Sequence, residues 1–284
     1  MAGSVTNRLV TLPAMSHGVL MLILSLFPGI DLLGRAFEQI GFFVVRGPDI
    51  LWGQDIRDFH APSGKFDGVI GGSPCQDFSN ARRSAPTGDG VDLMQEFARV
   101  VTEAEPAWWL LENVERAPDL DVPGYFVQRL TINALECGSR QNRNRKFQFG
   151  SKTGIIIAPQ RQPKPPKSER LPAAMATDGV RANRPGWSEF CQRQGLPADF
   201  DLPGWSTAAK YRAVGNGVPL SMGRTMARAI MQAVTQRCDA AIAASLREVT
   251  FCPCGCGRVL TGNQQRGSAA CRKRMQRRKR DSAA

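Results

Sequence analysis

Short apolar runs alternate with amphipathic segments through the first half of the chain. The runs near residues 19–27 and 107–114 are almost continuously apolar, which is typical of strands buried on both faces. We predict strands at 19–27, 42–45, 66–70, 107–114 and 146–149, and helices at 31–40, 91–103 and 125–135. This alternation favours an α/β fold with a parallel sheet and right-handed crossovers.

The second half of the chain has two different patterns. Residues 155–184 lose all periodicity and are rich in proline and basic side chains, as in an extended loop that can lie along a phosphate backbone. Order returns at Trp187, and residues 219–249 form a long helical tract.

Three polar turns follow predicted strands in the first half. Their sequences are FPGID at 27–31, GSPCQ at 72–76 and LENVE at 111–115. The carboxyl ends of parallel strands meet at one edge of a sheet, where such folds bind their ligands. We therefore expect the three turns to converge on one cleft.

The apolar run at 18–27 is too short to span a bilayer, and no small-residue cleavage site follows it. Four of the eight cysteines are scattered through ordinary sequence and four lie in a short basic stretch, which favours a reducing compartment. We expect no membrane association and a cytoplasmic location.

The net charge of +12 is unevenly distributed. Residues 251–284 hold nine Lys and Arg against one Asp, which is +8 and leaves only +4 for the rest of the chain. A basic tail on a nearly neutral body indicates a polyanionic partner such as nucleic acid. The alternative is a solvated tail that only aids solubility.

Glu112 follows five apolar residues at a predicted strand end, where its carboxyl group can have a raised pKa and share a proton. A helix cap is the alternative, and Asn113 could orient the carboxyl group. Gly29 would let the backbone approach a cofactor, although a plain strand-to-helix turn explains it equally well. Asp55 could accept hydrogen bonds from an adenine amine or a ribose, or occupy a surface turn.

Cys75 lies at a strand exit between Pro74 and Gln76, unlike a cysteine inside an apolar core run. A nucleophilic cysteine usually has a histidine nearby, but the chain holds only His17 and His60. Attack on a conjugated ring that Glu112 activates needs no histidine.

In order along the chain, the segments LFPGID, GGSPCQDFS, LENV, QNRNRKFQFG and YRAVGNGVP resemble those of DNA cytosine-5 methyltransferases. The resemblance runs from about Leu22 to Ile230. It implies a Rossmann-like methyltransferase sheet, S-adenosylmethionine as cofactor and double-stranded DNA as partner, and we expect a monomer.

The resemblance also implies roles for individual residues. The target cytosine is flipped out of the duplex, Cys75 adds to carbon 6 of its ring, and Glu112 hydrogen-bonds the ring nitrogen and exocyclic amine. Arg143 and Arg145 hold the base and the flanking backbone. The cofactor residues are Phe27, Gly29, Ile30, Asp55, Asn216 and Val218, and the further substrate-binding residues are Pro74, Gln76, Asn113 and Gln141. The assignment of Asn216 and Val218 requires the late part of the chain to fold back and complete the first sheet.

The chain departs from the family pattern in its first motif and in its recognition region. Asp31 stands where the family has a second glycine, and Asp49 is the acid nearest to the expected ribose contact. We divide the chain into a leader (1–17), a catalytic and cofactor-binding domain (18–154), a short target-recognition region (155–186), the C-terminal part of the catalytic domain (187–249) and a Cys-rich basic tail (250–284). So short a recognition region predicts a short target site or one of low information content, or a contribution to DNA binding from elsewhere, such as the tail.

The tail contains Cys252, Cys254, Cys256 and Cys271 before its basic run, and it resembles small zinc-ribbon-like tails. Four thiolates would satisfy tetrahedral zinc, although Cys-x-Cys-x-Cys spacing brings the ligands closer than the usual pairs. The alternative is a reduced tail without metal.

Two other functions fit the same motifs. One is a cytosine-5 methyltransferase that acts on RNA, such as transfer RNA, and the other is a nucleic-acid-binding protein whose cysteine is inert.

Overall fold

The computed structural model describes residues 20–74, 78, 88–247, 250–254, 256, 259–260 and 268–281, so the leader predicted at 1–17 lies outside the described residues. The chain divides into two compact units, residues 1–230 and residues 231–284. We describe each unit by itself.

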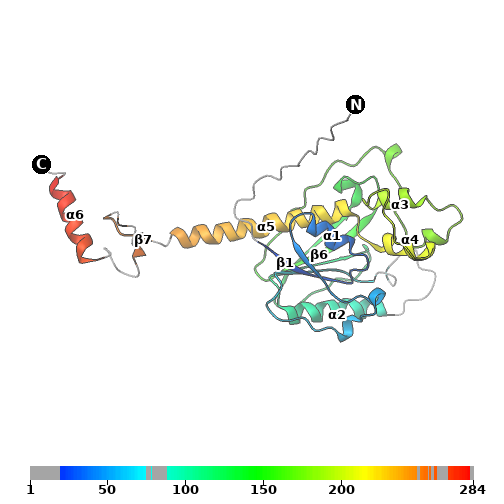
Figure 1. Ribbon diagram of the computed structural model, residues 1–284, viewed down its shortest axis with the longest axis horizontal. Helices are drawn as coiled ribbons and strands as arrows, with labels where there is room; N and C mark the ends of the chain where they lie inside the picture. Colours follow the sequence, from blue (N-terminus) through cyan, green and yellow to red (C-terminus); the bar gives the residue numbers. More distant parts are fainter. Residues whose placement is uncertain are drawn as a thin grey trace, which may run out of the picture. The chain divides into compact units, whose positions relative to one another are not determined.

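A mixed β-sheet forms the centre of the first unit (Figure 1). Among the described residues its order is β2-β1-β3-β4-β6-β5, with β1 Leu22–Leu26, β2 Phe43–Arg46, β3 Gly68–Gly72, β4 Trp108–Asn113, β5 Phe126–Asn133 and β6 Asn144–Ser151. The first four of these strands pair in parallel, as the sequence predicts. Strand β6 is antiparallel to both β4 and β5, so the expectation of a purely parallel sheet is wrong at this edge.

Large aromatic side chains fill both faces of the sheet around β4, which is buried along its whole length. Trp108 stacks with Phe37 on one face, and Trp109 meets Phe97 on the other. Gly68 on β3 and Gly150 on β6 leave room for the two indole rings, since a side chain at either position would collide with them. The glycines in these strands therefore serve packing rather than backbone freedom.

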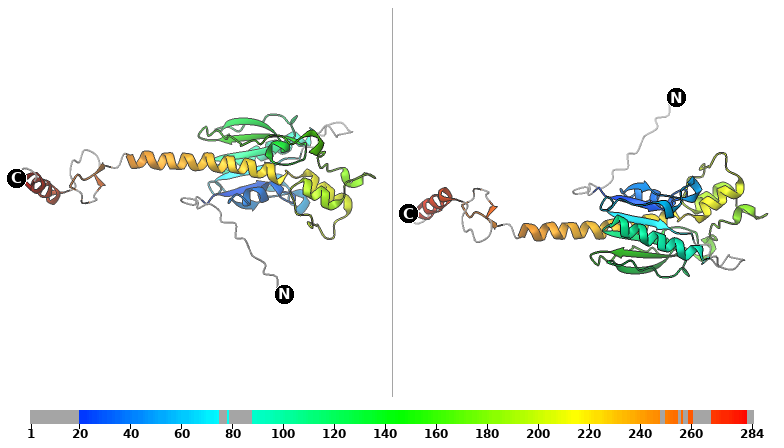
Figure 2. Two further views of the ribbon diagram at one scale, coloured as in Figure 1. Left: turned by 90° about the horizontal axis from the view of Figure 1, so that it is seen from above. Right: turned by 90° about the horizontal axis from the view of Figure 1, so that it is seen from below.

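Helices cover both faces of the sheet (Figure 2). Helix α2 (Asp89–Ala104) buries its apolar side on one face with Leu24, Val69 and Leu111. Helix α1 (Leu32–Glu38) and the beginning of α5 (Leu220–Arg247) lie on the other face. There Gly223 lies against Ala36, with no space for a larger side chain.

The predicted helix at 125–135 is wrong, because this segment forms β5 and a short 3-10 turn. All eight residues of β5 pair with β6. Arg129 on this strand pairs with Asp119 and Asp121, and Ile132 is buried. Pairing with a partner strand outweighs the local helical spacing, which rests on a few apolar residues.

Residues 155–186 contain no strand or α-helix, as the sequence predicts, and are followed by α3 (Trp187–Arg193) and α4 (Thr207–Asn216). The late part of the chain does fold back, but α4 and α5 pack on α1 and contribute no strand to the first sheet. The 3-10 turns are η1 Ile50–Trp52, η2 Ile56–Asp58, η3 Ala134–Cys137, η4 Lys167–Glu169 and η5 Asp178–Val180.

The second unit contains the short strands β7 (Thr250–Phe251) and β8 (Val259–Leu260), which pair antiparallel, and helix α6 (Ala269–Asp281). No described helix combines the length and apolar character needed to cross a membrane.

Candidate active site

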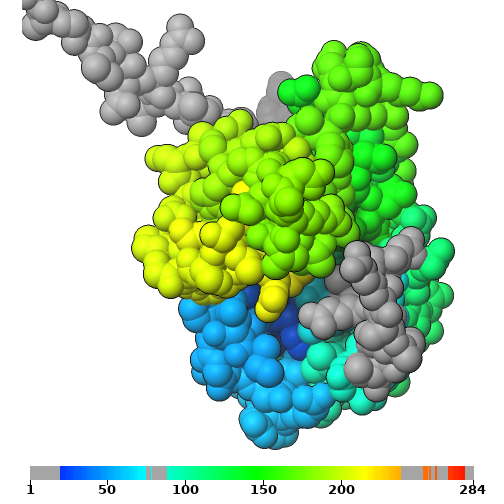
Figure 3. Space-filling view, turned by 90° about the vertical axis from the view of Figure 1, so that its right-hand side faces the viewer, coloured from blue at the N-terminus to red at the C-terminus, as the bar shows by residue number. Residues whose placement is uncertain are grey.

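A cleft of about 560 Å³ opens at the carboxyl ends of β1, β3 and β4. In Figure 3 it is the hollow between the light-blue surface of the early chain and the yellow surface of the late chain. We call residues 48–57 the early wall and residues 205–218 the late wall. The turns that follow β1, β3 and β4 all contribute to the cleft, which confirms the predicted convergence of the three motifs.

The turn after β1 has an unusual backbone, because Phe27, Gly29 and Asp31 have φ angles of 52°, 54° and 56°. Asp31 is buried and caps α1 by accepting a hydrogen bond from the amide of Gly34 (3.0 Å). It also accepts a hydrogen bond from Ser25 and pairs with Arg46 at 2.9 Å. Burial raises the pKa of Asp31 against these partners. The departure from glycine thus has a structural explanation: Asp tolerates this conformation and caps the helix.

Phe27, Gly29 and Ile30 line the cleft beside the early wall. Of the residues in the early wall, the sequence indicated only Asp49 and Asp55. The Asp49 carboxylate accepts hydrogen bonds from the amides of Gly29 (2.7 Å) and Leu51 (2.8 Å). The indole of Trp52 donates to the carbonyl oxygen of Gly29 at 2.9 Å. Asp49 therefore joins the early wall to the β1 turn, and its position directly before η1 is the cap signal that the sequence offers.

Asp55 also lies in the early wall and caps η2. It accepts hydrogen bonds from the amide and the guanidinium of Arg57, which hold the pKa of Asp55 below its usual range. Its carboxylate is about one-third exposed, so it stays charged beside the cleft.

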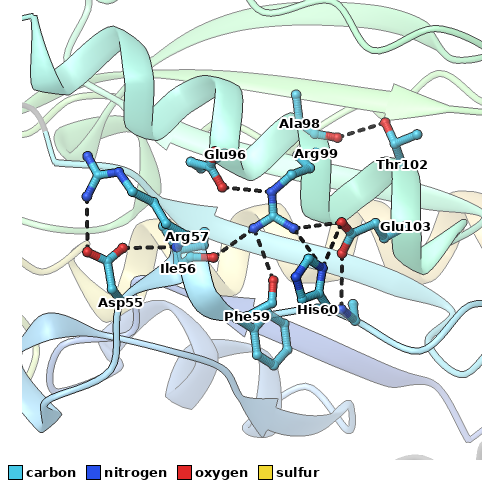
Figure 4. A network of polar contacts seen from close by, with 11 residues as sticks. Asp55, Ile56, Arg57, Phe59, His60, Glu96, Ala98, Arg99, Thr102 and Glu103 are labelled. Carbon is cyan, nitrogen blue, oxygen red and sulfur yellow. Dashed lines mark hydrogen bonds and ion pairs between the residues drawn. The ribbon is translucent and has the colours of Figure 1, made fainter.

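Arg99 on α2 fixes the backbone that carries Asp55 (Figure 4). Its Nη2 atom donates to the carbonyl oxygens of Ile56 (2.7 Å) and Phe59 (3.0 Å). Two glutamates on the same helix, Glu96 and Glu103, pair with Arg99 at 2.7 and 2.6 Å. The early wall is thus fastened to a regular helix.

Glu112 lies at the end of β4 and lines the cleft with Arg145, whose Nε atom is 2.7 Å from the carboxylate. Both side chains are largely buried, at 9% and 14% exposed. Burial raises the pKa of Glu112 and outweighs the opposing effect of Arg145 and Arg143. Gly72 leaves room for this carboxyl group, because a β-carbon there would lie 3.1 Å from it. A raised pKa at Glu112 is what the sequence predicts.

Asn113 joins the end of β4 to the exit of β3. Its side-chain amide donates to the Ser73 hydroxyl at 2.9 Å, and its oxygen accepts from the amide of Val114. Pro74, the next residue along, lines the cleft. The predicted site residues Cys75 and Gln76 lie outside the described residues.

Arg143 and Gln141 lie behind the cleft and do not line it. Arg143 is buried and donates to the carbonyl oxygens of Ala174 (2.8 Å), Gly215 (2.9 Å) and Gly217 (3.3 Å).

Gln141 is fully buried, where it accepts from the amide of Ala174 and donates to Arg193 and Gln194. Both side chains therefore hold backbone of the late part of the chain.

Asn216 and Val218 line the late wall together with residues that the sequence did not indicate. These are Trp205, Ala209, Arg212 and Ala213. Positions 209, 212, 213 and 216 recur at helical spacing, so one face of α4 meets the cleft, and this spacing was the available signal.

Four thiols gather in the second unit. The sulfur atoms of Cys252, Cys254, Cys256 and Cys271 all lie within 4.8 Å of one another. A tetrahedral zinc ion with Zn–S bonds of 2.3 Å places its sulfur ligands about 3.8 Å apart. The observed pairs at 3.5 and 3.6 Å fit that geometry. A hydrogen bond from Ser268 is the main factor that lowers the pKa of Cys271, whereas burial and the neighbouring thiols raise the pKa of Cys254, so the cluster shares its protons unevenly.

Comparison with known proteins places this site in context. A family model described as C-5 cytosine-specific DNA methylase matches residues 49–183. The Type II methyltransferase M.HgiDI of Herpetosiphon aurantiacus is 30% identical over 48% of this chain and 54% of its own. The Type II methyltransferase M.HgiGI of the same organism is 31% identical over 34% of this chain and 93% of its own. The chain spans about half the length of the first curated relatives it matches.

A solved structure of the methyltransferase EhMeth of Entamoeba histolytica covers 74% of this chain and 97% of its own, with a TM-score of 0.55 and 12% identity. At this identity the likeness concerns the fold, and it confirms the Rossmann-like α/β sheet expected from the sequence.

Proposed function

The chain belongs to the family of C-5 cytosine-specific DNA methylases, and from this premise we propose that it methylates carbon 5 of cytosine in double-stranded DNA. The observation that carries the proposal is Glu112, a buried carboxyl group with a raised pKa that lies in the cleft against Arg145. Such a group can both donate a proton to a base and accept a hydrogen bond from it.

We assign S-adenosylmethionine to the part of the cleft between the β1 turn and the two walls. When bound, this cofactor supplies an electrophilic methyl group. Apolar lining from Phe27, Ile30 and Val218 suits an adenine ring, and the carboxylates of Asp49 and Asp55 can accept hydrogen bonds from its amine or from ribose hydroxyls. The remaining cofactor residues are Gly29 and Asn216. A volume of about 560 Å³ lies within the usual range for small-molecule sites.

Glu112 and Cys75 would carry the chemistry on the base. Cys75 adds to carbon 6, and the electron pair displaced toward the ring nitrogen is stabilised by the Glu112 proton. Carbon 5 becomes nucleophilic and would take the methyl group, with S-adenosylhomocysteine as the leaving group. Transfer of the carbon-5 proton to a base such as water would then restore the carbon 5–carbon 6 double bond and release the Cys75 thiolate, and the ring-nitrogen proton would return to Glu112. Pro74, Gln76 and Asn113 would shape the turn that presents Cys75 and the base.

The two arginines receive different roles. Arg145 contacts Glu112 directly and would hold the base side of the cleft. Arg143 and Gln141 act as positioning residues, since their hydrogen bonds go to the backbone and side chains that support the late wall.

Transfer of a labelled methyl group separates the competing functions. Wild type should label cytosine-containing duplex DNA, and Glu112→Gln should lose about 10²- to 10⁴-fold in rate. The matched control is Glu115→Gln, which changes an exposed glutamate three residues later and should stay near wild type. Cys75→Ser should be inactive, and full activity in that variant would refute the covalent mechanism. Label in transfer RNA alone would favour the RNA enzyme, and no label in either would favour a binding protein.

Residues 155–186 are our candidate for target recognition. The segment is short and irregular, which supports a target site of low information content. Mapping the methylated cytosines on genomic DNA tests this, and a long, strictly read target sequence would contradict it.

A monomeric state remains a prediction, which sedimentation of the purified protein would check.

We further propose that Cys252, Cys254, Cys256 and Cys271 bind one zinc ion that stabilises the second unit. Four thiols at tetrahedral spacing support this assignment. Elemental analysis should find about one zinc per chain. A content below about a tenth of an equivalent, even after growth in zinc, would refute it.

A further inference from the structure

The thiol cluster and the basic helix of the second unit are physically connected. Cys271 lies in the first turn of α6 and is buried in the cluster. Met275, one turn later on the same side of the helix, packs against the cluster. Ser268 caps the helix by accepting a hydrogen bond from the amide of Cys271. The beginning of α6 is therefore held by whatever holds the four sulfur atoms together.

The rest of α6 carries exposed positive charge. Arg272, Lys273, Arg274, Arg277 and Arg278 all have exposed side chains. A rotation of 100° per residue places Lys273 and Arg277 on the side of the helix opposite Cys271 and Arg272 and Arg274 on its flanks, whereas Arg278 lies on the same side as Cys271. A cationic face thus points away from the cluster.

Helix α6 is a poor helix by itself. At 13 residues it is near the length at which isolated helices are marginal in water, and like charges one turn apart, such as Lys273 and Arg277, destabilise it further. Two contributions can offset this: a fixed first turn, which a metal at the cluster supplies, and anions along the cationic face. The two contributions act on the same helix.

We propose that zinc at the four cysteines assembles α6 into a duplex-DNA-binding face that contacts backbone phosphates without reading sequence. This inference rests on the proposed function for the choice of DNA and for the metal. Because both ligands stabilise the same helical state, each tightens the binding of the other, and the coupling is equal in both directions. The face would hold the enzyme on DNA while the cleft of the first unit acts on cytosine.

Binding of the full zinc-loaded chain to a duplex made only of A·T pairs tests the cationic face. This duplex contains no cytosine, so the result does not depend on the methylation site. The double variant Lys273→Gln/Arg277→Gln should weaken binding by about tenfold or more at 0.1 M salt and reduce the slope of log K against log[salt] by about 1.8.

The matched control, Lys65→Gln/Lys152→Gln, removes the same charge from exposed lysines of the first unit and should leave the slope nearly unchanged. Equal slopes for the two double variants would overturn the proposal, as would tighter binding to an RNA duplex of the same length.

Removal of the metal tests the coupling. Cys252→Ser/Cys254→Ser, or wild type treated with a chelator, should lose helical circular dichroism and bind the A·T duplex with the reduced slope of Lys273→Gln/Arg277→Gln. In wild type, the A·T duplex should raise the affinity for added zinc by the same factor as zinc raises the affinity for the duplex. DNA binding that is identical with and without zinc would overturn the coupling, whatever the methyl-transfer assays give.

Discussion

The two walls of the cleft are held in place by the same kind of contact, but the arginines that make this contact differ in how deeply they are buried. Each is a stretch of short turns or helix that an arginine fastens by donating to backbone carbonyl oxygens. Arg99 holds the end of the early wall through Ile56 and the chain just after it through Phe59, and Arg143 holds the late wall through Gly215 and Gly217.

The difference lies in the surroundings of the two arginines. Arg99 is 28% exposed and is neutralised by Glu96 and Glu103. Arg143 is 4% exposed and donates hydrogen bonds to carbonyl oxygens in the interior of the protein. Water can replace some bonds of Arg99 when they break, whereas it reaches the bonds of Arg143 poorly. The late wall should therefore be the more rigid one.

Arg143→Ala should have the largest effect. It removes charge-assisted hydrogen bonds to three carbonyl oxygens and leaves a buried space, so we expect the free energy of unfolding to fall by about 3–5 kcal/mol. Urea denaturation measures this. Arg140→Ala, which removes an exposed arginine with one carbonyl bond to Glu169, should cost less than about 1 kcal/mol. Equal costs would show that burial does not distinguish these arginines.

Glycine substitutions compare the backbones of the two walls. A β-carbon at Gly215 would lie 2.6 Å from the backbone nitrogen of Ala176, so Gly215→Ala should cost about 2–3 kcal/mol. Gly29 has φ +54° but open space around it, so Gly29→Ala should cost only about 1 kcal/mol, for its left-handed backbone. Thermal unfolding of both variants measures the two losses of stability, and a larger loss in Gly29→Ala than in Gly215→Ala would contradict the packing argument.

Arg99→Ala should separate cofactor binding from chemistry. We expect a loss of about 1–2 kcal/mol in stability and a several-fold rise in the KM for S-adenosylmethionine, because the backbone beside Asp55 loosens while Glu112 is untouched. Steady-state kinetics measure the change, with Gln95→Ala on the exposed side of the same helix as control. A fall in kcat at constant KM would place Arg99 in the chemical step instead.

The smallest effect should come from the pH dependence of the early wall. Partial burial acts to raise the pKa of Glu103, but hydrogen bonds from Arg99 and His60 hold it below the ordinary 4.5. Glu103 therefore contributes stability that is fully present above pH 4.5 and is lost as pH falls through its lowered pKa.

The stability difference between wild type and Glu103→Gln should shrink by less than about 1 kcal/mol from pH 6 to pH 3. Glu112 has the opposite sign, since its raised pKa makes its contribution fade as pH rises. Parallel titrations of Glu103→Gln and Glu112→Gln would reveal slopes of the same sign if this assignment were wrong.

The sequence predicted well where a residue ends a strand, and poorly where the chain is irregular. Glu112 lies at the end of a buried strand and Gly29 follows one, so their places at the cleft follow from the rule for parallel sheets. Arg143 lies in irregular chain directly before β6, where the alternation of side chains along a strand cannot predict which way a side chain points. In the structure it is buried and does not line the cleft. The role of Asp49 became clear only when the structure showed that it caps η1. The segment at 125–135 could be assigned as a strand only when its pairing with β6 was known.

Trp52 and Trp205 give the cleft an optical signal of its own. Their ring centroids are 6.1 Å apart, one ring on each wall, and Trp52 is 58% exposed. Trp108 and Trp109 are buried in the sheet, and Trp187 packs against Phe190 and Tyr211 outside the lining of the cleft, so these three should give a constant background. Any ligand that draws the walls together or parts them should change the tryptophan emission, so occupancy of the cleft can be followed without a label.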